Sequence, residues 1–144
     1  MKILVIGPLP DPVTGCSLAN QVLLRGLTKK DVKVSSINMS TSFSEEIGTF
    51  TFGKVFVAIS NYLHIYKVLL NDVIYITPGQ SFLGVLKYAP FIFLAKLFRK
   101  RVVVHIHGNH LWKEFELSGN FKRKILHSIL SCADKGIWLS PSLK

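Results

Sequence analysis

The feature that most constrains the fold is an alternation of short, β-branched runs with longer segments of helical periodicity. Five runs of five or six residues are rich in Val and Ile, as buried strands are. They cover residues 2–7, 32–37, 72–76, 101–106 and 135–139. Apolar residues recur at helical spacing between them, over residues 17–30, 54–70, 82–99 and 121–132. This alternation is typical of a parallel sheet with helices on both faces.

We therefore predict an α/β fold with a doubly wound, mostly parallel, Rossmann-like sheet of about five strands in the order 3-2-1-4-5. The apolar–polar alternation of residues 32–37 indicates a strand near the sheet edge. Residues 39–52 predict a loop, and residues 140–142 predict a turn into a further helix. The segment 82–99 is apolar almost all round, so we expect it to be buried, with membrane contact as the alternative.

Composition and length agree with one folded domain over residues 1–144. Hydrophobic residues make up 49% of the chain and charged residues 18%, which excludes a disordered chain. Cys16 and Cys132 match no zinc or redox spacing, and free thiols fit a reducing compartment. The first apolar run is too short for a secretory signal. We predict a cytoplasmic protein that contacts the inner face of the membrane.

The formal charge of +10 favours an anionic partner. Anionic lipid, phosphorylated small molecules and nucleic acid all fit that charge. No helix-turn-helix, RNP or zinc-finger pattern is present in the sequence, so we expect no nucleic-acid partner.

Ligands of open α/β sheets bind beyond the carboxyl ends of the strands, where the strand order reverses. In the predicted order this position lies between strands 1 and 4, so residues 7–17 and 107–110 should face each other. The latter loop contains Gly108 and Asn109. Residues 77–80, with Gly79 and Gln80, should lie further along the same edge.

The first loop, residues 7–17, lacks two common phosphate-binding motifs, G-x-G-x-x-G and G-x-x-x-x-G-K-[ST]. A nicotinamide-dependent dehydrogenase is therefore disfavoured. Thr14 and Gly15 still lie at a helix start, where backbone N–H groups can meet a phosphate. The alternative is a purely structural glycine beside an N-cap at Ser17. Cys16 is interpreted as a packed residue, because no partner base accompanies it.

Two histidines mark the end of the fourth strand. His105 and His107 are two residues apart and should share a face of the sheet. His107 precedes a glycine at the strand end, where a neutral imidazole can hydrogen-bond a substrate hydroxyl or accept a proton. A structural role is the alternative for His107, and we expect His105 to be a core or supporting residue. No carboxylate or thiol accompanies them, so we expect no metal and no cofactor.

An ordered set of segments resembles one enzyme family. The set comprises K-I-L-V-I-G-P-L-P at residues 2–10, a glycine at the first helix, H-I-H-G at 105–108 and L-S-P-S-L at 139–143. Together they resemble the N-terminal, acceptor-side lobe of the GT-B family 4 retaining glycosyltransferases, the "glycosyl group 1" enzymes of bacterial surface-polysaccharide assembly. The resemblance covers essentially all 144 residues.

The resemblance implies a hexosyltransferase that needs no metal and has two Rossmann-like lobes. It implies that the backbone of Gly15 approaches the phosphates of the nucleotide-sugar donor and that His107 reaches toward the transferred sugar. The chain departs from many relatives, with Thr14-Gly15 for a Gly-Gly pair and Gly108 for an aspartate. The donor-binding lobe with its E-x7-E motif is absent from these residues. We therefore expect the isolated chain to be inactive.

The implied partners are a nucleotide-sugar donor, bound mainly by the other lobe, and a glycan or lipid-linked acceptor. An anionic membrane surface is a further expected partner, through Lys122, Arg123, Lys124 and Trp112. A solvated helix face is the alternative for these cations. A non-catalytic binding module or subunit that contacts anionic lipid or glycan is the second functional hypothesis.

Overall fold

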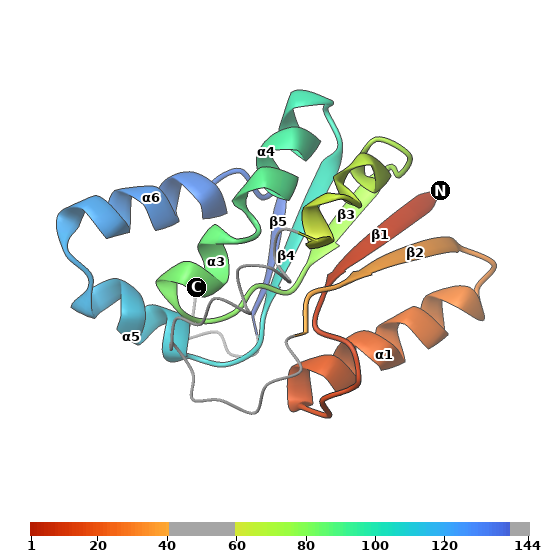
Figure 1. The fold of residues 1–144 in the computed structure, drawn as a ribbon, viewed down its shortest axis with the longest axis horizontal. Helices are drawn as coiled ribbons and strands as arrows, with labels where there is room; N and C mark the ends of the chain where they lie inside the picture. Colours follow the sequence, from red (N-terminus) through yellow and green to blue (C-terminus); the bar gives the residue numbers. More distant parts are fainter. Residues whose placement is uncertain (41–59, 139–144) are drawn as a thin grey trace.

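The computed structural model describes residues 1–40 and 60–138, which form an α/β fold around one five-stranded parallel sheet (Figure 1). The strands are β1 (Lys2–Gly7), β2 (Lys33–Asn38), β3 (Val73–Ile76), β4 (Arg101–Ile106) and β5 (Lys135–Trp138). This confirms the predicted fold class and places a strand at each of the five runs. Most of the predicted loop 39–52, the first part of the predicted helix 54–70, and residues 139–144 lie outside the described residues.

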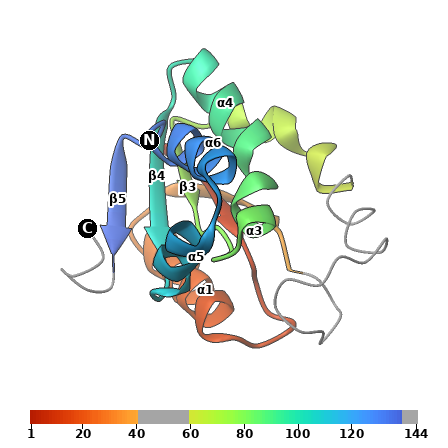
Figure 2. The ribbon, with the colours of Figure 1, turned by 90° about the vertical axis from the view of Figure 1, so that its left-hand side faces the viewer.

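The helices form two layers around this sheet. They are α1 (Gly15–Thr28), η1 (Ile65–Val68), α3 (Phe82–Leu86), α4 (Ala89–Leu97), α5 (His110–Leu117) and α6 (Asn120–Leu130). Helix α1 packs on β1 and β2, whereas α3 to α6 pack on one another over the other face (Figures 1 and 2). The core lies under α4 and α6, where Phe91 and Leu126 are fully buried against Ile74 and Val102.

The strand order is β2-β1-β3-β4-β5, so the predicted order 3-2-1-4-5 is wrong. Strand β3 lies between β1 and β4, with Ile74 opposite Leu4 and Val102. Ile74 and Ile76 are fully buried, and an edge position would have exposed one side of this strand. Strand β2, with its alternating pattern, takes the edge as predicted.

The corrected order moves the place where ligands bind in such sheets. The chain runs outward from β1 in one direction to β2 and in the other to β3, β4 and β5. The strand order therefore reverses between β1 and β3, not between strands 1 and 4. Residues 77–80, expected at the margin, follow β3 and lie at the centre of this edge.

The apolar segment 82–99 forms two helices rather than one. Pro90 lies in the first turn of α4, and its ring and missing N–H prevent the helix from continuing through Lys87 and Tyr88. The expectation that the segment is buried is also only partly right. Tyr88 and Phe91 are buried, but an outward face of apolar side chains is exposed. It comprises Leu83, Leu86, Phe93, Leu97 and Phe98.

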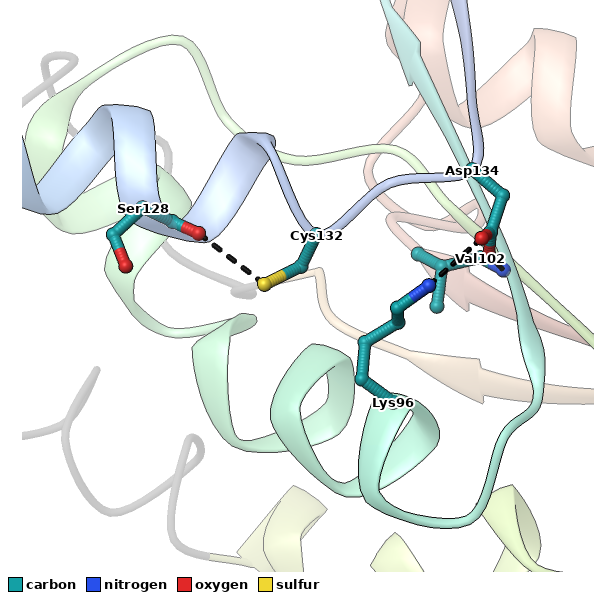
Figure 3. Close-up of polar contacts among 5 residues, drawn as sticks. All are labelled: Lys96, Val102, Ser128, Cys132 and Asp134. Atoms are coloured by element: carbon teal, nitrogen blue, oxygen red, sulfur yellow. Dashed lines mark hydrogen bonds and ion pairs between the residues drawn. The ribbon is translucent and has the colours of Figure 1, made fainter.

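Strand β5 is held beside β4 by Asp134, the residue before it (Figure 3). The Asp134 carboxylate accepts hydrogen bonds from Lys96 Nζ and from the Val102 backbone N–H, each at 2.7 Å. These two bonds hold the pKa of Asp134 below its usual value. Cys132, two residues before Asp134, is a free thiol that donates to the Ser128 carbonyl at 3.3 Å. The end of α4 and the start of β5 are thus fixed together.

The ends of β1 and β3 are joined by one side chain from α1. Asn20 Nδ2 donates to the Pro8 carbonyl at 2.9 Å and to Thr77 Oγ1 at 2.8 Å. The side chains of Asn20 and Thr77 are both buried. The Thr77 N–H donates to the Ile6 carbonyl at 3.0 Å. A Cβ on Gly7 would overlap Thr77 Oγ1 and lie 2.7 Å from Asn20 Nδ2. This β1–β3 junction therefore requires glycine at position 7.

We predict that Gly7→Ala lowers the free energy of unfolding by about 3 kcal/mol, because the added methyl group overpacks the β1–β3 junction. Urea unfolding measures the change. The matched control is Gly26→Ala in α1, where a Cβ meets nothing within 4 Å. That variant should gain about 1 kcal/mol from helix propensity. A Gly7→Ala protein as stable as the parent would contradict the packing described for this junction.

Candidate functional site

Three loops meet at the carboxyl edge of the sheet, after β1, β3 and β4 (Figure 1). Every residue predicted to bind substrate lies in these loops or at the helix starts that follow them. Thr14 and Gly15 lie at the start of α1, Gly79 and Gln80 follow β3, and residues 107–109 follow β4.

The start of α1 is two residues earlier than the sequence pattern predicted. Thr14, not Ser17, is the N-cap, and Ser17 completes a capping box with it. Thr14 Oγ1 accepts from the Ser17 N–H at 3.1 Å, and Ser17 Oγ accepts from the Thr14 N–H at 2.7 Å. A Cβ on Gly15 would meet nothing within 4 Å. Packing therefore does not require glycine there, and the helix start is open to a ligand.

Gln80 fastens the loop after β3 to the loop after β4. Its Nε2 donates to the His107 carbonyl, and its Oε1 accepts from the His110 N–H at 2.8 Å. Gly108 has φ +106°, and a Cβ there would lie 3.0 Å from the Gln80 amide. Gln80 and Gly108 thus orient the loop that carries His107. Asn109, the N-cap of α5, is exposed and makes no side-chain capping bond.

At Gly79 the backbone of the loop after β3 passes close to the backbone of α3. A Cβ there would lie 3.2 Å from the Gly84 Cα, in α3. Gly79 therefore has a packing role that folds the loop onto α3, and substrate contact at this residue stays a prediction.

Tyr75, His105 and His107 form a polar cluster on the sheet face opposite the core. Alternate residues of a strand point to opposite faces, and the neighbouring Ile76, Val104 and Ile106 belong to the core. The Tyr75 hydroxyl bonds to His105 Nδ1, and the His105 and His107 ring centroids are 4.0 Å apart. The predicted shared face of the two histidines is confirmed, and the His105 ring lies directly against the His107 ring.

Burial keeps all three groups of this cluster uncharged at neutral pH. It raises the pKa of Tyr75 to about 12 and lowers the pKa of both His105 and His107; the neighbouring His107 lowers that of His105 further. The protonated phenol can donate to His105 Nδ1 or accept from it, according to which ring nitrogen of His105 carries the proton.

The Nε2 atoms of His105 and His107 have no hydrogen-bond partner among the described residues, although both atoms are buried. Buried polar atoms are nearly always satisfied, so packing within the described residues does not explain this unpaired pair. A neutral imidazole there can donate to or accept from a hydroxyl, or act as a base.

Cys16 lies against the same cluster but is not activated. Burial raises the pKa of its thiol, and a hydrogen bond with the Thr77 side chain opposes this only in part. The thiol form therefore dominates at neutral pH, which agrees with the interpretation of Cys16 as a packed residue.

The cations expected to contact a membrane do not form one patch. Lys122 Nζ lies 5.4 Å from the centre of the Phe82 ring. Arg123 Nε donates to the Phe115 carbonyl at 2.9 Å, and its guanidinium also donates to the Glu116 carbonyl at the end of α5. Lys124 is exposed on another side of α6, and Trp112 is half-exposed on α5.

Helix α5 itself was missed, since residues 107–110 were interpreted only as a loop. The four-residue spacing of Leu111 and Phe115, both turned toward the core cluster, is the signal that could have found it.

Within residues 1–40 and 60–138, no group of three or more His, Cys, Asp or Glu side chains could hold a metal ion. None of the helices over residues 1–40 and 60–138 has both the length and the apolar character to cross a membrane.

Comparison with known proteins gives a fold and no family. No protein-family model matches the chain, and no curated protein matches it. Among solved structures, it is similar to a conserved protein from Enterococcus faecalis V583, at 10% identity and a TM-score of 0.50. The match covers 96% of this chain and 92% of that one. At this identity the likeness shows the shared α/β fold alone.

We predict that the melting temperature falls as the pH is lowered from about 7 to about 5. The pKa values of His105 and His107 are lowered in the folded protein, so the unfolded chain binds protons more readily over this range. The stabilisation is present above the ordinary histidine pKa of about 6.5 and is lost as the pH falls below it. The double variant His105→Gln, His107→Gln should show a flatter pH profile by calorimetry. An unchanged slope would contradict burial of the two rings.

Proposed function

We propose that this chain is the acceptor-binding lobe of a retaining glycosyltransferase, which moves a sugar from a nucleotide-sugar to a glycan or lipid-linked acceptor in bacterial surface-polysaccharide synthesis. The observation that carries the proposal is His107: a neutral, partly buried imidazole with an unpaired Nε2, at the edge where α/β sheets bind ligands. The segments that resemble GT-B family 4 enzymes include this residue.

His107 is the residue that we assign to the reacting sugar. The Gln80 bond holds its backbone carbonyl and the tilted His105 ring lies against its side chain, so little freedom is lost when a ligand binds. A hydrogen bond from a fixed neutral imidazole to a sugar hydroxyl orients that sugar and strengthens if charge develops on it in the transition state.

The start of α1 is the second part of the proposed site. The first turn of α1 presents the backbone N–H groups of Gly15 and Cys16 to a diphosphate, whereas the Thr14 N–H is bonded to Ser17 Oγ. In this proposal the remaining donor contacts come from a separate donor-binding lobe, so the lobe alone binds sugars without turnover.

A non-catalytic module that binds glycan or anionic lipid is the alternative, since the same unpaired imidazole could hold a glycan hydroxyl without transfer. Contact with an anionic membrane surface and a cytoplasmic location stay predictions. The exposed apolar side chains of α3 and α4, together with the net charge of +10, support the membrane contact.

We predict that His107→Ala weakens binding of a sugar ligand about tenfold, the loss expected from one hydrogen bond of about 1.4 kcal/mol. Calorimetric titration of the chain with a panel of nucleotide-sugars and oligosaccharides identifies the ligand and measures the change. His64→Ala is the matched control, because His64 is exposed and lies away from the carboxyl-edge loops.

The melting temperature should hardly change in either variant. Equal affinity of His107→Ala and His64→Ala for every sugar that binds would overturn the assignment of His107. A collapse of the melting temperature in His107→Ala, with unchanged affinity per folded molecule, would make the residue structural.

A further inference from the structure

An apolar pocket of about 230 Å³ lies next to the candidate site and is lined by residues from the ends of β4 and β5 and from α5 and α6. Its apolar walls are Ile106, Leu111, Trp112, Phe115, Leu130 and Trp138. Gly108, directly after His107, also lines it. The sequence pattern gave no sign of this pocket, because its walls come from a helix that was not predicted.

The chemistry of the walls selects an apolar occupant. His127 and Ser131, both on α6, supply the polar side chains apart from the indole N–H groups. A sugar ring bound here would leave most of its hydroxyls without partners, which is costly in an apolar site. Hydrocarbon gains affinity from the same walls, about fourfold for each methylene removed from water. The volume equals about eight water molecules, which suits one narrow chain.

The two tryptophans mark the mouth of the pocket. Trp112 is 52% exposed and Trp138 is 37% exposed, although the ring of Trp112 stacks on Phe115 inside. Large aromatic surfaces left in water around a hollow are typical of binding sites rather than of a closed core.

Charge at the rim favours an anionic head group. The polar wall is α6, where Lys124 lies one helical turn before His127 and is exposed on the same side. The Arg123 guanidinium lies 5.8 Å from the centre of the Phe115 ring. Glu116, one turn after Trp112, is the acid of this rim. Among the α6 cations, Arg123 and Lys124 lie nearest the lining residues, whereas Lys122 Nζ lies over the Phe82 ring outside the pocket.

We propose that this pocket binds the apolar chain of a single anionic amphiphile, a hydrocarbon chain with a phosphate head, and that the head lies near Arg123 and Lys124 of α6. The proposal goes beyond sugar transfer and does not depend on it, because the pocket is formed by residues other than the His105–His107 pair.

The chain itself supplies the reporter for the test. It contains two tryptophans, and both line the pocket, so their fluorescence reads occupancy directly. The probes are decyl phosphate, octyl phosphate, decyl maltoside and inorganic phosphate, each kept below any micelle concentration. Decyl phosphate should give a saturable blue shift at the lowest concentration. Octyl phosphate should bind about fifteenfold more weakly for its two missing methylenes, decyl maltoside more weakly for its neutral head, and inorganic phosphate should give no shift.

Two pairs of variants locate the site. Ser131→Phe fills the pocket and should weaken decyl phosphate at least tenfold, whereas Ser128→Phe, on the same helix outside the lining, should not. Lys124→Glu should weaken the binding of decyl phosphate but not that of decyl maltoside. Lys29→Glu, at the end of α1, should change the affinity for neither probe. If Ser131→Phe fails to fold, the Lys124 pair still tests the proposal.

Several results would overturn it. They are the absence of a shift with decyl phosphate, equal affinities of Ser131→Phe and Ser128→Phe, or equal affinities of the phosphate and maltoside probes. A response that needs micelles or anionic vesicles, with none to dispersed amphiphile, would replace the pocket by general surface contact. None of these results would bear on sugar binding at His107, which calorimetry measures separately.

Discussion

The hydrogen bonds of the Asn20 amide to Pro8 and Thr77 decide how the carboxyl edge of this sheet is built. They hold β3 directly beside β1, with Gly7 leaving the space that Thr77 fills. Because β3 occupies this place, its terminal loop lies between the start of α1 and the end of β4. The meeting of three loops at one edge is therefore a consequence of one buried polar contact between α1 and two strand ends.

From that junction the candidate site follows in two steps. Gln80, three residues after Thr77, reaches the loop after β4 and fixes it through backbone atoms at His107 and His110. Tyr75, two residues before Thr77, bonds to His105, whose ring in turn contacts that of His107. One short stretch of β3 and its loop thus orients the histidine from both sides. On the far side of the same loop, Gly108 borders the apolar pocket.

The sequence predicted what depends on local pattern and failed where tertiary contacts decide. Apolar periodicity located the five strands and α6, and the spacing of His105 and His107 gave their common face. The alternation in β2 indicated the edge position that this strand takes, whereas no local pattern placed β3 between β1 and β4. Pro90 was a visible helix breaker within 82–99. In contrast, nothing local shows that Asn20 bonds Thr77, that Gln80 bridges two loops, or that Arg123 is engaged by carbonyls of α5.

The central claim is that the Tyr75–His105–His107 cluster is neutral and presents an unpaired imidazole nitrogen to a sugar. Imidazole ¹⁵N spectra test it most directly, with His64, His110 and His127 as references in the same sample. At pH 7 we predict neutral rings for His105 and His107. Saturating the protein with a sugar ligand that calorimetry identifies should shift the His107 Nε2 resonance most. Protonated rings at pH 7, or an unmoved His107 resonance at saturation, would contradict the account.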